Sequence, residues 1–356
     1  MDVAAARGRF ARAVAGTFGA SCRIVAAESL HGDASSRRYV RLTLDGDAPA
    51  HVVVMVLAEG RFAGGDELGG GGDDAEIPFV QVARYLAAGG LPVPTVHHDA
   101  SATDGFLLLE DVGDVTLWAA ARSRPDAAAG LFGDAVDLLV RLQALGAQRP
   151  DPSCRAFGRR FDTALAAAEL EHFIDHGIET RHGTRLEPAP RRAVLDALAP
   201  LLVPFADGPF VLSHRDYMAW NLHVRDDRLV LIDFQDALLA PDAFDLAQLL
   251  TDRTTSTLLS TRDEEALVDR FLRGRADAGL TTAPGFRDRM ERCVLQHALK
   301  VIGRFHFLEC VRGKAGYLAY LPAVYAVARR SFAALPELAD ARALLRPWLP
   351  ELEPAA

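Results

Sequence analysis

The chain has 356 residues, of which 50% are hydrophobic and 24% charged, a composition typical of a globular protein. This length can bury a substantial core and suggests two lobes rather than one compact unit. The formal net charge of -9 argues against a nucleic-acid partner, because a phosphate backbone would be repelled. No apolar run is long enough to span a bilayer, and the first residues lack the apolar block of a secretion signal. We therefore expect no membrane partner and a cytoplasmic location.

The first part of the chain favours one helix followed by a small antiparallel sheet. Residues 1–18 place hydrophobic side chains near one face of an amphipathic helix. A second helix is expected to begin at Pro78, because proline suits the first turn of a helix, and to end at Gly89. The strand-like stretches are residues 24–26, 39–44, 52–56 and 106–109.

Beyond residue 113 the hydrophobic pattern becomes mostly helical, as over residues 131–145 and 295–308. The exception is an apolar run at residues 210–212, followed by two short strands at 222–224 and 229–232 that a turn joins. We therefore expect an α+β protein with a small antiparallel-sheet lobe and a larger, mainly helical lobe. The predicted lobes are residues 1–112 and 113–356.

The most informative motif lies around this predicted hairpin. His214-Arg215-Asp216 is followed by Asn221, and Asp233 ends the second strand. The HRDxxxxN spacing holds a carboxylate and a carboxamide on one tight loop, which suits phosphoryl transfer. Asp216 would orient an acceptor hydroxyl and take its proton, while Asn221 and Asp233 would hold Mg²⁺, which prefers oxygen ligands. The alternative is structural, with His214 in the core, Asp216 in a turn and Asn221 as a helix cap.

Acidic residues after the motif have less certain roles. Asp236 is either a sugar contact or an acid near the metal, or else a cap or salt-bridge partner. Asp245 opens a predicted helix and is expected to anchor the catalytic loop.

A second candidate segment, residues 32–38 between two predicted strands, would turn backbone N–H groups and arginines toward phosphate. Neighbouring residues on a strand alternate faces, so at most one of its two arginines points inward, and the choice between them stays open. The candidate phosphate-binding residues are Ser35, Ser36, Arg37 and Arg38.

The segment at residues 211–250 resembles the catalytic core of the aminoglycoside phosphotransferase and choline kinase superfamily. Asp-Phe-Gln-Asp-Ala at 233–237 is similar to the bacterial anomeric kinases of cell-wall recycling, which phosphorylate N-acetylmuramate and N-acetylglucosamine at the C1 hydroxyl. Three further stretches fit that subfamily: GDASSRRYVR at 32–41, GFLLLEDVGD at 105–114 and LQHALKVIGRF at 295–305.

This resemblance implies a bilobal protein-kinase-like fold, ATP and Mg²⁺ as cofactors, and a small-molecule sugar as substrate. It places Glu110 and Val112 at a hinge whose backbone groups pair with the adenine edge. It also makes Lys300 and Arg304 candidate sugar contacts, although a charged stripe at helical spacing is more often solvated. A sugar 1-phosphate product would normally pass to a downstream sugar nucleotidyltransferase.

Two departures from the family pattern affect the prediction. The third strand, residues 53–56, lacks the lysine that normally holds the α- and β-phosphates, and the following helix lacks its glutamate partner. Arginines, backbone amides and magnesium would then neutralise the phosphates. Trp220 stands where the subfamily tends to carry arginine. An indole stacks on a sugar face but does not bind a carboxylate, so Trp220 counts against the acidic amino sugar, and the choice between the neutral and the acidic acceptor stays open.

Three functions remain after this comparison. The first is an ATP-dependent kinase of an amino sugar, with Asp216, Trp220 and Asp236 among its substrate contacts. The second is a kinase of another small molecule, such as choline, homoserine, an aminoglycoside or another sugar. The third is a pseudokinase or nucleotide-binding scaffold, suggested by the absent lysine, although a scaffold would not need Asp216, Asn221 and Asp233 together.

Overall fold

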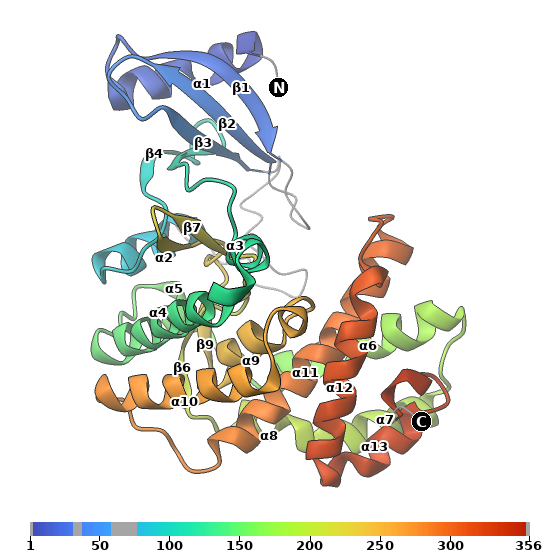
Figure 1. Ribbon diagram of the computed structural model, residues 1–356. Helices are drawn as coiled ribbons and strands as arrows, with labels where there is room; N and C mark the ends of the chain where they lie inside the picture. Colours follow the sequence, from blue (N-terminus) through green and yellow to red (C-terminus); the bar gives the residue numbers. More distant parts are fainter. Residues whose placement is uncertain (1–2, 31–37, 58–76, 354–356) are drawn as a thin grey trace. The chain divides into compact units, whose positions relative to one another are not determined.

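The protein is described here by a computed structural model, which covers residues 3–30, 38–57 and 77–353 (Figure 1). The chain divides into two compact units. Unit 1 runs to Val115 and includes His223–Asp236, whereas unit 2 comprises Thr116–Leu222 and the residues from Ala237 onward. The predicted functional lobes, residues 1–112 and 113–356, stay a prediction.

Unit 1 is built on a five-stranded antiparallel sheet with the order β1-β2-β3-β5-β4. Helix α1 packs against this sheet, where Phe10 meets Phe106 with ring centroids 5.0 Å apart. The elements of the sheet and its helices are α1 (Val3–Phe18), β1 (Arg23–Leu30), β2 (Arg38–Asp45), β3 (His51–Val56), α2 (Pro78–Ala88), β4 (Val96–Ala100) and β5 (Phe106–Glu110).

The alternating sequence of the strands explains which face of the sheet is buried. In β2 and β3, every second side chain enters the core beneath α1, as expected for a sheet with one covered face. The buried residues of this pattern are Val40, Leu42, Leu44, Val52, Val54 and Val56. The predicted helices and strands of this region are confirmed. Strand β4 was not predicted, because its sequence, VHHDA, lacks the alternating hydrophobic pattern.

The predicted hairpin near the motif is also confirmed, as β7 (Leu222–Arg225) and β8 (Arg228–Leu231). Its turn residues Asp226 and Asp227 have φ angles of 49° and 56°, the left-handed conformation that tight hairpin turns require. Within unit 1, Leu231 N–H donates to the carbonyl of Pro92 at 2.8 Å, which ties the hairpin to the rest of the unit.

Unit 2 is mainly helical, with one two-stranded antiparallel sheet formed by β6 and β9. The predicted α+β class, with an antiparallel sheet in the N-terminal part and helices in most of the remainder, is confirmed. The elements are α3 (Leu117–Ser123), α4 (Ala128–Gln148), α5 (Arg155–Gly158), α6 (Thr163–Phe173), α7 (Pro188–Leu198), α8 (Val203–Asp207), β6 (Phe210–Ser213), β9 (Leu238–Pro241), α9 (Phe244–Thr251), α10 (Thr261–Asp277), α11 (Phe286–His306), α12 (Leu321–Ala334) and α13 (Ala339–Leu345).

Helix α11 is the central element of this unit and packs against α6, α9 and α12. Figure 1 shows α11 and α12 running side by side. Gly303 allows the close approach of α11 and α6, because a Cβ atom added there would lie 2.6 Å from the Cα of Phe173. No helix among the described residues is long and apolar enough to cross a membrane.

Candidate active site

The HRDxxxxN motif forms a loop of unit 2 that begins where β6 ends, and Asp245 of α9 anchors this loop. The buried Asp245 carboxylate accepts the backbone N–H groups of His214 at 2.6 Å and Arg215 at 3.0 Å. Arg215 has φ 78°, a left-handed conformation that is uncommon for a residue with a side chain and that these bonds help to hold. The predicted anchoring role of Asp245 is confirmed.

Further hydrogen bonds close the loop between Asp216 and Asn221. The side-chain nitrogen of Asn221 donates to the carbonyl of Asp216 at 2.8 Å, and Met218 N–H donates to the same carbonyl at 3.0 Å. Because its nitrogen faces the backbone, the carboxamide oxygen of Asn221 is the atom suited to a cation. The Tyr217 hydroxyl donates to the carbonyl of Ala135 at 2.8 Å and fixes the loop to α4.

A buried cluster of charges lies beside Asp216. Glu169 of α6, 3% exposed, is 3.0 Å from the ammonium group of Lys300 and 3.8 Å from the guanidinium group of Arg215. Gln296 donates to the other oxygen of Glu169 at 2.8 Å. Burial by itself would raise the pKa of Asp216, but the positive charges of Lys300 and Arg215 outweigh it and lower this pKa below its ordinary value. Asp216 is therefore held as a carboxylate near neutral pH.

The polar side chains at residues 296–304 are less exposed than their helical spacing predicted. Gln296 is fully buried and His297 is 4% exposed. Burial lowers the pKa of His297 to about 3, so this imidazole is neutral near pH 7. Lys300 contacts Glu169, and Arg304 lies over the ring of Phe307 at 5.4 Å. Their predicted roles as sugar contacts stay predictions.

Trp220 belongs to an aromatic cluster of unit 2. Its ring stacks on Trp118 of α3, with centroids 4.2 Å apart and an interplanar angle of 20°. The guanidinium carbon of Arg253, a residue that follows α9, lies 5.1 Å from the centroid of Trp220. One face of Trp220 is thus covered by Trp118, and the predicted stacking of a sugar on Trp220 would need the remaining surface of the ring.

The second carboxylate of the motif, Asp233, belongs to unit 1. It has φ 63°, again a left-handed conformation, and the neighbouring Phe234 is fully buried against Phe79 with ring centroids 4.8 Å apart. The side-chain nitrogen of Gln235 donates to Asp233 at 2.8 Å and to Asp236 at 3.3 Å. These contacts hold the two carboxylates in one turn, and strained backbone of this kind is often found at functional sites.

The candidate nucleotide-binding residues are only partly described. Ser35, Ser36 and Arg37 lie outside the described residues, and Arg38 opens β2 with an exposed side chain. Glu110 N–H is used in the sheet by the carbonyl of Thr95 at 2.9 Å, so only other backbone groups near it could meet an adenine edge. Strand β3, the third strand of the chain, contains no lysine, and its Met55 is 1% exposed.

An arginine that was not predicted lies on the neighbouring strand. Arg41 of β2 contacts Asp111 at 2.5 Å and Asp114 at 2.8 Å, and these hydrogen bonds raise the pKa of Arg41. The same guanidinium lowers the pKa of Asp114. At Asp111 burial is the largest single influence and acts to raise the pKa, but Arg41 and the Gly113 N–H together outweigh it and lower the pKa. This network stiffens the segment that contains Val112.

The donor set for a cation is oxygen-based. Asn221 of unit 2 offers its carboxamide oxygen, and Asp233 of unit 1 is a carboxylate. No group of three or more His, Cys, Asp or Glu side chains among the described residues is arranged as a metal site. Oxygen atoms of this kind suit magnesium, which is commonly bound by one or two protein oxygens together with phosphate and water oxygens.

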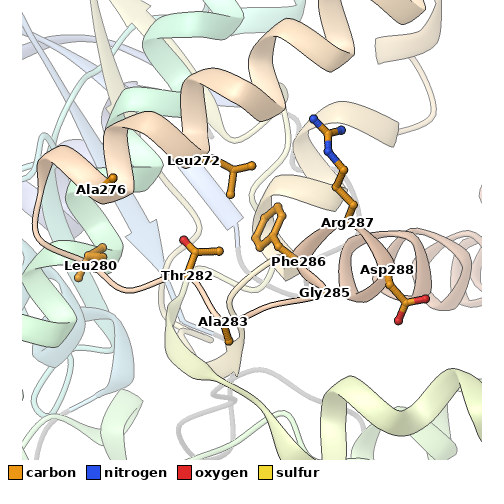
Figure 2. A pocket seen from close by; sticks show the side chains of 9 residues that line it. All are labelled: Leu272, Ala276, Leu280, Thr282, Ala283, Gly285, Phe286, Arg287 and Asp288. Atoms are coloured by element: carbon orange, nitrogen blue, oxygen red, sulfur yellow. The ribbon is translucent and has the colours of Figure 1, made fainter.

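One pocket lies apart from these residues, between the C-terminal part of α10 and the start of α11 (Figure 2). Its walls include Leu272, Leu280 and Phe286, with Arg287 and Asp288 at its edge. None of the candidate catalytic or binding residues lines it. It therefore adds nothing to the candidate active site.

The sequence did not reveal Glu169, Trp118, Asp252 or Arg253. Glu169 is one acid in an alanine-rich helix, and no spacing pattern connects it with Lys300. Asp252 is buried, which raises its pKa to about 6, and its carboxylate accepts Arg253 N–H at 2.6 Å. The available signal was an Asp-Arg pair directly after a hydrophobic helix, which is too common to identify a site.

Comparisons with known proteins agree with this geometry. The family described as "Phosphotransferase enzyme family" matches residues 26–288. The N-acetylmuramate/N-acetylglucosamine kinase of Pseudomonas putida is 33% identical over 267 residues, which cover 74% of this chain and 75% of that protein. The enzyme of the same name from Pseudomonas aeruginosa is 32% identical, covering 75% of this chain and 77% of that protein.

Solved structures show the same fold at low sequence identity. A choline/ethanolamine kinase family protein from Mesorhizobium loti has a TM-score of 0.58 and 16% identity, with 96% of this chain and 100% of that chain covered. The streptomycin-ATP-APH(2")-IIa ternary complex has a TM-score of 0.52 and 15% identity, with 87% of this chain and 95% of that chain covered.

Proposed function

This chain belongs to the phosphotransferase enzyme family, and we propose that it transfers the γ-phosphate of ATP to the anomeric C1 hydroxyl of N-acetylmuramate, N-acetylglucosamine or both. The match confirms the predicted superfamily. The observation that carries the proposal is the anchored HRDxxxxN loop, in which the field of Lys300 keeps Asp216 ionised. The names of the curated relatives support the choice of acceptor, because each similarity extends over about three quarters of both chains.

In this proposal Asp216 accepts a hydrogen bond from the C1 hydroxyl and aims it at the γ-phosphate. A sugar hydroxyl is a poor nucleophile near pH 7, and in a loose transition state its proton leaves late, so an ionised carboxylate is suited to receive it. Asn221 and Asp233 would hold Mg²⁺, which when bound neutralises charge on the transferring phosphate. The tight loop keeps Asn221 and Asp216 in fixed relation during transfer.

The proposed division of labour follows the predicted lobes. Residues 1–112, with Ser35, Ser36, Arg37, Arg38 and the hinge, would bind the nucleotide, and residues 113–356 would bind the sugar. ATP as phosphate donor is supported by the related fold of a structure that contains ATP. A sugar 1-phosphate product suits a nucleotidyltransferase as the next enzyme, and the cytoplasm, where ATP is available, stays the predicted location.

The test is release of ADP in the presence of Mg²⁺ and ATP with N-acetylmuramate, N-acetylglucosamine, choline, homoserine and an aminoglycoside as separate acceptors. The product should be a sugar 1-phosphate, identified by the coupling of its phosphorus to the anomeric proton in NMR spectra. The methyl glycoside of N-acetylglucosamine is the matched control, because it lacks only the reacting hydroxyl and should release no ADP above background.

Three results would contradict the proposal. Turnover of the methyl glycoside would move the reaction to another hydroxyl. Turnover of choline, homoserine or the aminoglycoside alone would favour the alternative kinase functions. ATP binding without ADP release for any acceptor would favour a nucleotide-binding scaffold.

A further inference from the structure

Helix α3 is fastened to the middle of the catalytic loop by Trp118. The backbone N–H of Trp118 donates to the carbonyl of Ala219 at 3.2 Å, and its ring stacks on that of Trp220, with centroids 4.2 Å apart. Ala219 and Trp220 directly precede Asn221, whose own N–H donates to the carbonyl of Met218 at 2.9 Å. Trp118 therefore holds the loop at the two positions that lead into Asn221.

Both faces of the Trp220 indole are covered within unit 2. Trp118 covers one face, with an interplanar angle of 20°. The guanidinium carbon of Arg253 lies 5.1 Å from the centroid of Trp220, and it also lies over Phe305 of α11 at 5.6 Å. An indole and a guanidinium that each lie over a ring do not share one face of it at these separations. Arg253 therefore takes the face opposite Trp118.

The N–H edge of the same indole also faces a protein group. Burial raises the pKa of Asp252 to about 6, while Arg253 and the indole N–H of Trp220 act to lower it. An N–H group has this effect only when it lies close to the carboxyl group and favours its charged form. The Trp220 ring thus has protein groups where a stacked sugar would lie.

The stack extends beyond the two tryptophans. The guanidinium carbon of Arg122, an exposed residue of α3, lies 5.0 Å from the centroid of Trp118. Two indole rings therefore lie between two cations, and indole is the aromatic ring that attracts a cation most strongly. This arrangement restrains the Trp220 ring and, through it, the backbone that leads into Asn221.

The restraint matters because the Asn221 side chain has two tasks. Its nitrogen donates to the carbonyl of Asp216 at 2.8 Å, and in the proposed mechanism its oxygen would hold Mg²⁺. Groups that orient a metal ligand without touching the metal change metal affinity or activity by about 10- to 100-fold when they are removed. A ring held from three sides beside Asn221 is suited to this orienting task.

We propose that Trp220 and Trp118 are positioning residues, which act through Asn221 on the binding and reaction of ATP with Mg²⁺ and not through contact with the sugar. This inference rests on the proposed function and deepens it, because it assigns position 220 to the phosphate side of the reaction. It also gives a role to α3, which contains none of the candidate catalytic residues.

The test compares Trp220→Leu, Trp118→Leu and the double variant with the wild-type chain. Each single variant should lose about 10- to 100-fold in kcat, and calorimetry without sugar should show a similar loss in the affinity for ATP with Mg²⁺. The affinity for ATP without Mg²⁺ and the KM for N-acetylglucosamine should stay nearly unchanged. Because both rings serve one stack, the double variant should lose little more than either single variant.

Two further variants serve as controls. Trp220→Phe keeps a ring in the stack and should recover most of the kcat that Trp220→Leu loses. Trp348 lies against His182, elsewhere in unit 2, so Trp348→Phe is the matched control and should leave kcat and both affinities unchanged. Thermal unfolding checks that each variant is folded.

Several results would overturn the inference. A raised KM for the sugar in Trp220→Leu, with kcat and ATP affinity kept, would make Trp220 a sugar contact. Normal kinetics of Trp118→Leu would remove the stack from the mechanism. A measurement that needs no leucine variant to fold is tryptophan emission, which N-acetylglucosamine alone should leave unchanged in the wild-type chain. A change that Trp220→Phe abolishes would also overturn the inference. Failure of the wild-type chain to release ADP with any acceptor would instead contradict the proposed function itself.

Discussion

The ammonium group of the half-buried Lys300 lies 3.0 Å from the buried carboxylate of Glu169, and this ion pair controls the charge beside Asp216. Lys300 lowers the pKa of Asp216, so Lys300→Met should raise it. Because catalysis needs Asp216 ionised, the acidic limb of the kcat/KM profile should move to higher pH. A profile that extends below about pH 4, where an aspartate titrates, and uses N-acetylglucosamine checks this prediction. A change in KM without any movement of the limb would contradict it.

The same variant tests stability. Removal of Lys300 leaves the Glu169 charge with weaker compensation, and breaking a buried ion pair costs about 3 kcal/mol. Adding Glu169→Gln in a double variant should recover part of the lost free energy of unfolding, because glutamine keeps an oxygen for Gln296 without a charge. Urea unfolding of both single variants and the double variant supplies the comparison.

Asp216→Asn should fold normally and lose turnover by about 10²- to 10⁴-fold, the usual contribution of a general base. Asparagine has nearly the same shape, and the bonds that close the loop use the backbone carbonyl of Asp216 rather than its side chain. The measurement is kcat under saturating ATP and sugar, with thermal unfolding as the control for folding. Near-normal turnover would remove Asp216 from the mechanism.

Asp252 should make the protein less stable as pH rises. Its folded pKa of about 6 lies above the ordinary value of 3.8 for an aspartate, so the folded state binds the proton more tightly than the unfolded state. The resulting stability is fully present below about pH 4 and is lost as pH rises through 6, in total about 3 kcal/mol at about 1.4 kcal/mol per pKa unit. Asp252→Asn should lack this dependence.

Urea unfolding at pH 4.5, 6.0 and 7.5 checks the Asp252 prediction. The free-energy difference between Asp252→Asn and wild type should favour the variant increasingly toward pH 7.5. Asp207→Asn changes an exposed aspartate and serves as the matched control. Parallel pH dependences for wild type and Asp252→Asn would mean that Asp252 does not titrate in this window.

Asp227→Gly should stabilise the protein by about 1 kcal/mol, because Asp227 has φ 56° and a side chain in this region is strained where glycine is not. Asp47→Gly is a matched control at an aspartate that does not have a positive φ, and it should be neutral or destabilising through the greater entropy of the unfolded chain. Thermal unfolding compares the two variants, and equal shifts would refute the role of the turn conformation.

The parts of the fold that depend on local sequence could be predicted. Alternating residues and an Asp-Asp turn indicated the hairpin β7–β8, Pro78 marked the start of α2, and Asp245 was correctly expected to anchor the loop. In each case the residues that determine the conformation are close in sequence or follow a fixed motif spacing.

The parts that depend on packing between distant segments could not be predicted. Glu169 and Gln296 are 127 residues apart, and nothing in either segment marks them as partners. Helical spacing placed Gln296 and His297 on a charged stripe, but α11 is surrounded by other helices, so that stripe lies inside the unit. The aromatic surroundings of Arg253 likewise arise only when α9, α11 and the catalytic loop meet.

The close approach of α6 and α11 at Gly303 affects the ion pair between Lys300 and Glu169. It lies one turn from Lys300, and its neighbour Phe173 lies one turn from Glu169, so the spacing between the two backbones also sets the reach of the ion pair. A methyl group at position 303 would push the helices apart and carry the ammonium group away from its carboxylate. The glycine at position 303 therefore influences the pKa of Asp216 through the position of Lys300.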